Sequence, residues 1–220
     1  MIVEFCGLPG CGKSTLISYC NPNPKYALNR TDLFNRVRYS SQFYRFFPDC
    51  FFFGRDNDII KQYVKEYPLS NDWFNRMLYR LNHALIHSAN KTIILEEGPL
   101  QYITSVPFDH NINVDVALRN VVALLCQKEA LVFKCECPID FAIDRIQKRR
   151  ENGYTNNGRY DVSDNKLLYE RLKIKESNIN TVLGLVSCKV ICIDMTLPLE
   201  DNAKIVIDSV NSITKHSIWF

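Results

Sequence analysis

The chain has 220 residues, a length that favours one domain with a single hydrophobic core and excludes a multidomain receptor or a peptide-sized scaffold. Hydrophobic residues make up 46% of it and charged residues 23%, which excludes an intrinsically disordered protein. The 27 basic and 24 acidic residues leave a net charge of only +3, so nothing in the overall charge marks a nucleic-acid or membrane-surface binder.

The first residues predict a strand, a loop and a helix in direct succession. An apolar run over 2–6 indicates the strand, and residues 14–20 are compatible with a helix until Asn21-Pro22-Asn23-Pro24 ends it. The loop between them fits the phosphate-binding pattern G-x-x-x-x-G-K-[ST]. Its residues, with the threonine that follows, are Gly7, Leu8, Pro9, Gly10, Cys11, Gly12, Lys13, Ser14 and Thr15.

Each residue type in this loop has a chemical task. Glycines let the backbone curl so that successive N–H groups face a phosphate chain, and the positive N-terminal end of the following helix adds to the attraction. We expect Lys13 to reach the β- and γ-phosphates and the Ser14 hydroxyl to bind Mg²⁺. The sequence therefore predicts a site for a nucleoside triphosphate, with ATP and Mg²⁺ as the cofactors.

The segment from 25 to 90 is predicted to hold a short strand over 25–29 and helices over 31–47, 56–66 and 74–88. Aromatic residues and arginines are concentrated over 34–55, a composition that suits either the core of a helical region or a pocket for a base, sugar or anion. We interpret most of these aromatics as core and assign the acceptor-binding region to 30–90. His83 and His87 lie one helical turn apart without a third ligand, and are not assigned as a metal site.

Acidic residues follow the next buried strand, which is predicted over 92–95. Glu96 and Glu97 come directly after it and precede Gly98-Pro99. The carboxyl ends of parallel strands are where such sheets bind ligands. One of these carboxylates can support Mg²⁺, and we assign Glu96 to that role with Ser14, while the other can accept the proton of an attacking hydroxyl. The sequence does not decide which acts as base, and the alternative is that both only cap the following turn and helix.

The remaining elements alternate between strands and helices. Strands are predicted over 130–133 and 190–193, and helices over 115–126, 138–151, 163–181 and 199–214. This alternation indicates an α/β fold with a parallel sheet covered on both faces. We find no internal repeat, low-complexity tract or flexible linker, so residues 1–220 are interpreted as a single domain.

A cluster of basic residues lies near the end of the helix predicted over 138–151. Arg145 and Arg149 share a helix face, and Arg159 follows a polar, glycine-bearing stretch. Arginines on a mobile lid, here 145–162, could neutralise charge on a transferring phosphoryl group and exclude water. The alternative is a solvated helix end.

The nine cysteines are odd in number and scattered, which argues against a disulfide framework. Cys135 and Cys137 form the close pair, but no second pair or histidine cluster completes a zinc site. The N-terminal residues do not have the pattern of a signal peptide, and no apolar run reaches the roughly 18 residues of a membrane span. We therefore expect reduced thiols, a cytoplasmic location and no membrane partner.

These motifs together resemble the small P-loop kinases, and within them the thymidylate kinase and deoxynucleoside kinase branch of the nucleoside monophosphate kinase group. The resemblance is carried by the loop from Gly7 to Ser14, the strand ending in Leu95-Glu96-Glu97, and Cys137-Pro138-Ile139-Asp140 with the arginines that follow. The segment from Ile193 to Asp201 also resembles these enzymes, in which it helps form the adenine pocket. This chain has Glu97 and Gly98 where they place an arginine, so the acidic pair looks more like a Walker B ending.

The resemblance implies a three-layer P-loop NTPase fold, with a five-stranded parallel sheet in the order 2-3-1-4-5 and a lid between the fourth and fifth strands. It implies transfer of the ATP γ-phosphoryl group to a small acceptor. Carried over by position, Lys13 and Ser14 serve the phosphates and Mg²⁺, Glu96 falls at the catalytic carboxylate, and Arg145, Arg149 and Arg159 are lid arginines. With Glu97, these are the candidate catalytic residues.

The leading hypothesis is a Mg²⁺-ATP-dependent kinase of a nucleoside, a nucleoside monophosphate or a similar small molecule. Alternatives are a P-loop ATPase that acts as a nucleotide-dependent regulatory switch, a kinase of a sugar or other metabolite, and a degenerate loop that binds a phosphate metabolite without turnover. Asn165-Lys166-Leu167-Leu168 lacks the aspartate of a guanine motif, which disfavours a GTPase. We expect a small-molecule acceptor as partner and no nucleic acid, while the acceptor's identity and the oligomeric state, with a homodimer among the options, stay open.

Overall fold

The structure is a computed structural model that describes residues 2–20, 27–28, 58–59, 62–63, 93–96, 98–105, 111–126, 131–153, 160 and 162–213. For residues 27–28 the description is of the backbone alone. The acceptor-binding region expected over 30–90, its aromatic residues and the predicted helices over 31–47 and 74–88 lie outside these ranges. Of the helix expected over 56–66, the four described residues are helical.

The described strands form one parallel sheet in the order β2-β3-β1-β4-β5. They are β1 (Ile2–Gly7), β2 (Ala27–Leu28), β3 (Ile93–Leu95), β4 (Leu131–Glu136) and β5 (Lys189–Asp194). β1 lies in the centre, is buried along its whole length, and pairs with β3 on one side and β4 on the other. The phosphate loop therefore begins at the carboxyl end of the central strand.

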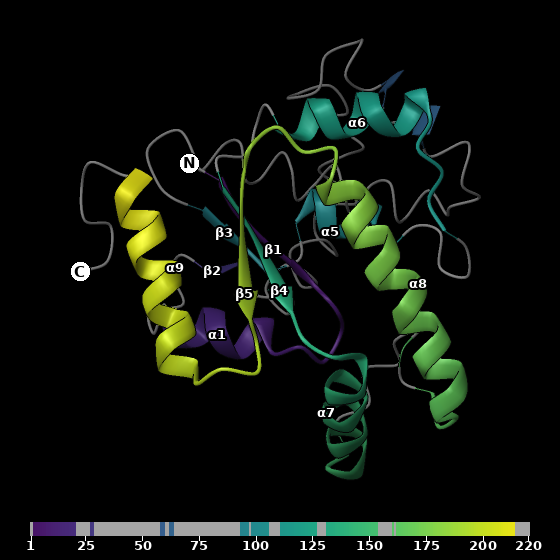
Figure 1. The fold of residues 1–220 in the computed structure, drawn as a ribbon, viewed down its shortest axis with the longest axis vertical. Coiled ribbons are helices and arrows are strands. Elements are labelled where there is room, and N and C mark those ends of the chain that lie inside the picture. The colour runs from purple at the N-terminus through teal and green to yellow at the C-terminus, as the bar shows by residue number, and fades with distance from the viewer. Residues whose placement is uncertain are drawn as a thin grey trace, which may run out of the picture.

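Helices cover both faces of this sheet (Figure 1). On one side α1 (Lys13–Cys20) packs against α9 (Leu199–Ile213). On the other lie α5 (Pro99–Ile103), α6 (Val116–Cys126) and α8 (Asn165–Leu183), and both α5 and α8 contact β1. α7 (Ile139–Glu151) continues beyond the carboxyl end of β4 and packs on α8.

The core forms where the strands and the apolar faces of these helices meet. Phe5 and Phe133 stack between β1 and β4 with ring centroids 4.8 Å apart, and both are fully buried. Leu16 of α1, Val206 of α9 and Leu172 of α8 have no exposed surface and belong to the same cluster. Burial of such side chains stabilises the fold by about 1.5–3 kcal/mol each, and it fixes the strand ends that carry the site.

The parallel sheet between helical layers confirms the α/β class, and the helices expected after residue 115 lie within two residues of their predicted bounds. The five strands lie in the order that the resemblance implied, with β2 at one edge. Of the strand expected over 25–29, the structure describes Ala27–Leu28, so β1, β3, β4 and β5 form the body of the described sheet and β2 is a short addition at its edge. Within the described residues, β2 pairs with β3 through Ala27 with Ile94 and Leu28 with Leu95.

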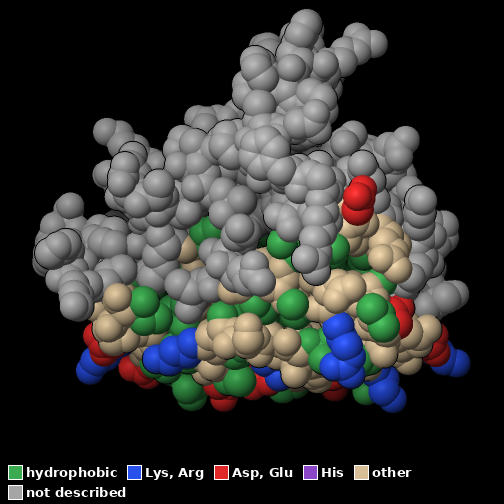
Figure 2. All heavy atoms as spheres, turned by 90° about the horizontal axis from the view of Figure 1, so that it is seen from above, with side chains coloured by type: hydrophobic (Ala, Val, Ile, Leu, Met, Phe, Trp, Pro, Cys, Tyr) green, Lys and Arg blue, Asp and Glu red, His purple; other side chains and the backbone are tan. Residues whose placement is uncertain are grey.

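Basic and acidic side chains are interspersed along the described part of the face in Figure 2. That mixture agrees with the small net charge of +3. Within the described residues, the structure contains no helix whose length and hydropathy would let it span a membrane.

Candidate functional site

The predicted phosphate loop connects β1 to α1 and is built on two glycines with left-handed backbone conformations. The φ angle is +82° at Gly10 and +105° at Gly12, a region that side chains rarely adopt. A Cβ atom at Gly12 would also lie 2.5 Å from Nη1 of Arg145. Gly12 is therefore needed both for the backbone turn and for the close approach of an arginine.

Lys13 is folded back over the loop. Its side chain is 8% exposed, and its Nζ donates hydrogen bonds to the carbonyl oxygens of Gly7 and Leu8, each at 2.9 Å, and to Sγ of Cys11 at 3.6 Å. The ammonium group thus lies inside the curl of the loop, at the position where an anionic ligand would meet it. A phosphate there would compete with the two carbonyl groups for the same protons.

Ser14 and Glu96 come together at the carboxyl edge of the sheet. The Ser14 hydroxyl donates a hydrogen bond to Oε1 of Glu96, and both side chains reach solvent. Ser14 is the second residue of α1, directly after Lys13, and Glu96 is the first residue after β3. The structure therefore brings together the two oxygen-bearing side chains that the sequence predicted as metal ligands.

Of the two described lid arginines, Arg145 and Arg149, Arg145 donates a hydrogen bond to the loop. Its Nη1 donates to the carbonyl oxygen of Cys11 at 3.1 Å, and its guanidinium lies 5.1 Å from the centroid of the Phe141 ring. The cation–π contact and the hydrogen bond hold the Arg145 guanidinium against the phosphate loop. This position suits the stabilisation of negative charge on a ligand in the loop.

The other predicted arginines are placed differently. Arg149 lies one turn further along α7, and its Nε is buried without a hydrogen-bond partner among the described residues. Arg150, which we did not predict, donates to the carbonyl oxygen of Val162 at 2.7 Å and to Oε1 of Gln147 at 3.2 Å. It therefore joins the two ends of the predicted lid. Arg159 and Glu97 lie outside the described residues, and Thr15 is an exposed residue of α1.

The cysteine of the loop carries an unusual electrostatic environment. A hydrogen bond from the Cys135 thiol, together with the charge of Lys13, lowers the pKa of Cys11 to about 5 despite its burial. The same hydrogen bond, followed by burial, raises the pKa of Cys135 well above its usual range. The charged form is therefore favoured at Cys11, beside the ammonium group, and disfavoured at Cys135.

Sequence reasoning missed two buried polar residues that support the loop. Glu4 is fully buried in β1, and its carboxylate accepts hydrogen bonds from the backbone N–H groups of Leu100 at 3.2 Å and Gln101 at 2.6 Å, in α5. The Gln101 side chain is 6% exposed and pairs with the backbone of Gly7. A charged residue within an apolar strand, and Pro99 as the start of a helix, were the available signals.

The segment between β5 and α9 also approaches the loop. Met195 lies beside Gly12, with its Cε 3.3 Å from the place that a Cβ of Gly12 would take. Thr196 donates to Oδ1 of Asp194 from its hydroxyl at 2.6 Å and from its N–H at 2.9 Å, and these bonds lower the pKa of Asp194. The turn is thus held rigidly next to the loop, where the resemblance places an adenine pocket.

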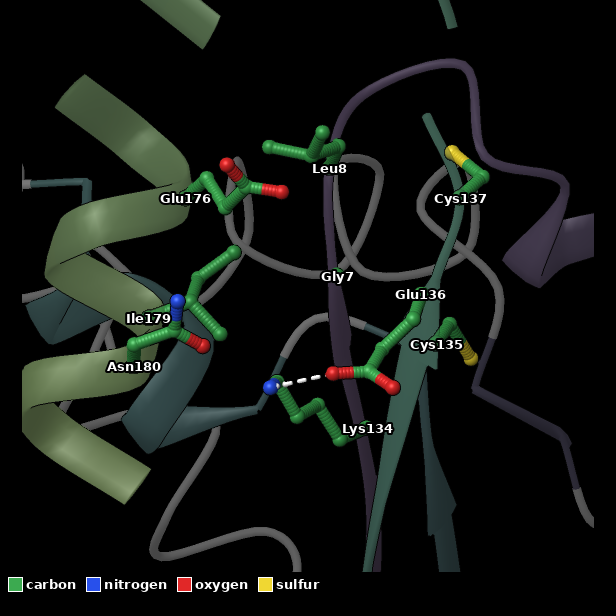
Figure 3. Close-up of a pocket in the computed structure, with 9 residues that line it drawn as sticks. All are labelled: Gly7, Leu8, Lys134, Cys135, Glu136, Cys137, Glu176, Ile179 and Asn180. Atoms are coloured by element: carbon green, nitrogen blue, oxygen red, sulfur yellow. Dashed lines mark ion pairs between the residues drawn. The ribbon is translucent and has the colours of Figure 1, made fainter. Parts of the chain in front are cut away.

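A small pocket of about 60 Å³ flanks the start of the loop on the side of α8 (Figure 3). Lys134 and Glu136 form an ion pair on its β4 wall, and Glu176 and Asn180 face it from α8. Ligand pockets usually measure about 300–1,000 Å³, so this one accommodates a few water molecules rather than a nucleoside. This pocket therefore lies beside the phosphate loop and is too small to hold a nucleoside acceptor.

Solved structures share this fold. The deoxyadenosine kinase from M. mycoides, in its structure with the products dCMP and a flexible dCDP, has a TM-score of 0.55 and 15% sequence identity, and the match covers 96% of this chain and 100% of that chain. The structure of that enzyme with bound dATP has a TM-score of 0.54 and 17% identity over the same shares of both chains. No protein-family model and no curated protein sequence matches the chain.

The likeness extends over nearly the whole length of both chains. At this level of identity it establishes the fold and leaves the chemistry to be argued from the residues of this chain.

Proposed function

We propose that the protein is a kinase that transfers the γ-phosphoryl group of Mg²⁺-ATP to a nucleoside. The observation that carries the proposal is the convergence of the Lys13 ammonium, the Ser14 hydroxyl and the Glu96 carboxylate at the carboxyl end of the central strand. A phosphate chain needs this combination of a cation, loop N–H groups and a metal-binding edge. Transfer, rather than binding alone, is supported by Arg145, whose charge lies against the loop.

The residues at the edge of the loop fit a magnesium ion. The Ser14 hydroxyl and a Glu96 carboxylate oxygen already face each other, and hard oxygen ligands of this kind are those that Mg²⁺ prefers. When bound, the ion would offset the charge of the β- and γ-phosphates. In this proposal Lys13 turns from the Gly7 and Leu8 carbonyl groups to the phosphates, and Arg145 stabilises charge on the transferring group.

A nucleoside is the favoured acceptor because the fold is shared with a deoxyadenosine kinase whose structures contain dATP, dCMP and dCDP. A nucleoside monophosphate such as thymidylate, or a sugar, is a competing acceptor within the same mechanism. Glu97 and Arg159 retain the roles predicted for them, as a second carboxylate and as a lid arginine, and 30–90 remains our proposed acceptor-binding region. We further propose a cytoplasmic enzyme whose partner is this small molecule.

The test is the production of ADP from Mg²⁺-ATP across a panel of deoxynucleosides, ribonucleosides, nucleoside monophosphates and sugars. We expect turnover with one or more nucleosides, and phosphorylated product at the same rate as ADP. ATP hydrolysis that does not depend on the acceptor, and that a protein partner stimulates strongly, would indicate a regulatory ATPase instead. A folded protein that binds Mg²⁺-ATP but phosphorylates none of the panel would contradict the proposal.

A further inference from the structure

Gln101 forms two hydrogen bonds with the first glycine of the phosphate loop. The N–H of Gly7 donates to Oε1 of Gln101 at 3.0 Å, and Nε2 of Gln101 donates to the carbonyl oxygen of Gly7 at 3.1 Å. One side-chain amide thereby satisfies both polar groups of one backbone residue. This is the pairing that a neighbouring strand would otherwise provide.

The strand on that side of β1 ends too early to do so. β3 pairs with β1 from Ile2 to Glu4 and stops at Leu95, whereas β4 continues on the opposite side as far as Gly7. The chain turns after Leu95 into α5, and α5 presents the Gln101 side chain to the open edge of Gly7. Gln101 therefore extends the sheet by one residue at the point where the strand becomes the loop.

The backbone of Gln101 is fixed by hydrogen bonds at both its N–H and its carbonyl group. Its N–H donates to Glu4 of β1 at 2.6 Å, and its carbonyl oxygen accepts a hydrogen bond from the Lys175 ammonium of α8 at 3.2 Å. Lys175 is 2% exposed and also donates to the Thr104 hydroxyl at the end of α5. Because the Gln101 backbone is held in this way, its side-chain amide fixes the orientation of the Gly7 peptide group.

The Gly7 carbonyl oxygen accepts a second hydrogen bond, from Nζ of Lys13 at 2.9 Å. If Lys13 alone satisfied this oxygen, moving the ammonium to a phosphate would leave a buried acceptor without a partner, which would oppose phosphate binding. Because Gln101 bonds to the same oxygen, Gly7 stays paired when Lys13 leaves. The loop also keeps its shape, because the N–H of Gly7 remains fixed.

We propose that Gln101 is a positioning residue for phosphate binding: it holds the Gly7 peptide at the open edge of β1 and so leaves Lys13 free to bind phosphates. This inference rests on the proposed function, in that it takes the loop to bind ATP. It assigns Gln101 no contact with ATP. We therefore predict that replacing Gln101 weakens the binding of ligands that carry phosphates and does not change the binding of the base and sugar.

The experiment compares wild type, Gln101→Met and Asn178→Leu by calorimetry with Mg²⁺-ATP and with adenosine. Asn178 is a matched control because it is also a buried amide, 1% exposed, whose Oδ1 accepts a bond from the N–H of Ile112 away from the loop. We expect Gln101→Met to raise the Kd for ATP about tenfold and to leave the Kd for adenosine unchanged. Asn178→Leu should change neither Kd, although both variants lower Tm.

A second variant, Gln101→Glu, tests whether ATP affinity depends on pH, which it would not do if Gln101 had a merely structural role. The carboxylate of Gln101→Glu can accept from the Gly7 N–H but cannot donate to its carbonyl, and it attracts the Lys13 ammonium. ATP affinity of Gln101→Glu should be weak at neutral pH and recover as the pH falls and the carboxyl group becomes a donor. This pH dependence should be absent from Gln101→Met. The variant also decides the question if Gln101→Met does not fold.

The outcomes separate the two proposals. Wild-type affinity for ATP in Gln101→Met, or equal losses for ATP and adenosine, would overturn the inference and leave the kinase proposal intact. ATP binding that depends on Gln101 in a protein that phosphorylates no acceptor would support the inference and overturn the kinase proposal. A wild-type protein without affinity for ATP would overturn both.

Discussion

The Ser14 hydroxyl donates a hydrogen bond to the carboxylate of Glu96, although the two residues are 82 positions apart in the sequence. One follows the central strand and the other follows its neighbour, so parallel pairing of β1 with β3 brings them to one edge. The contact joins the phosphate loop to the acidic end of a second strand. Because the two side chains are in contact, single and double substitutions can test whether Ser14 and Glu96 support the same magnesium ion.

If Ser14 and Glu96 support the same ion, their substitution should not be additive. We expect Ser14→Ala and Glu96→Gln each to raise the Mg²⁺ concentration needed for half-maximal activity, and the double variant to be little worse than the poorer single one. Magnesium titration of steady-state activity at fixed ATP gives the comparison. Losses that multiply fully in the double variant would show that the residues act independently.

Lys13 should contribute charge to catalysis more than it contributes to stability. We expect Lys13→Met, which keeps the aliphatic stem, to lower kcat about 10²- to 10³-fold, the range for loss of one group that stabilises transition-state charge. Lys148→Met is the matched control because Lys148 is an exposed lysine paired with Asp144. Its activity should equal that of wild type. Ordinary turnover in Lys13→Met would remove Lys13 from the site.

Two glycines with positive φ angles allow the close approach of Arg145 to be tested apart from backbone strain. Gly153 has φ +75° and a Cβ there would contact nothing within 4 Å, whereas a Cβ at Gly12 would collide with Arg145. Gly153→Ala should cost about 1 kcal/mol of unfolding free energy, and Gly12→Ala a similar amount, because the end of the flexible Arg145 side chain can move away from the new Cβ atom. Urea unfolding measures both. We also expect Gly12→Ala, but not Gly153→Ala, to weaken ATP binding, because the displaced guanidinium no longer donates to the Cys11 carbonyl oxygen. Equal ATP affinities of the two variants would refute the packing argument.

The two predicted arginines of α7 should differ in importance. Arg145 donates to the loop at the Cys11 carbonyl, while no described contact connects Arg149 with the loop. We expect Arg145→Met to lower kcat about 10²-fold and Arg149→Met to have a smaller effect. Steady-state kinetics with saturating ATP would show this order. A larger loss in Arg149→Met would mean that α7 moves before transfer occurs.

Cys11 should make stability depend on pH. Its pKa falls from the ordinary value of 9.0 to about 5 in the folded protein, so its contribution is full above pH 9 and is lost as pH falls through 5. Cys135 stays protonated below pH 9 because its pKa is raised. The free energy of unfolding should therefore rise less between about pH 5.5 and about pH 8 in Cys11→Ala than in wild type. Cys192→Ala, at an exposed position, should follow wild type.

The sequence predicted those parts of the fold and site that depend on local patterns. Apolar runs located β1, β3, β4 and β5, and the glycine pattern placed Lys13 and Ser14 together. Contacts between distant segments left weaker signals. Glu4 gives no local sign that it binds the start of α5, and the length of β2 depends on its pairing with β3. Arg145 and Arg149 look equivalent on a helix face, and only the path of α7 distinguishes them.

The carboxylate of Glu4 has a consequence for how the chain reaches its native state. A strand that buries a carboxyl group in the centre of a sheet is unstable until the N–H groups of Leu100 and Gln101 form hydrogen bonds with it. We therefore expect β1 and α5 to form together, as one cooperative unit. Native-state amide exchange should accordingly give Phe5 and Ile103 a common opening free energy, despite their separation along the chain.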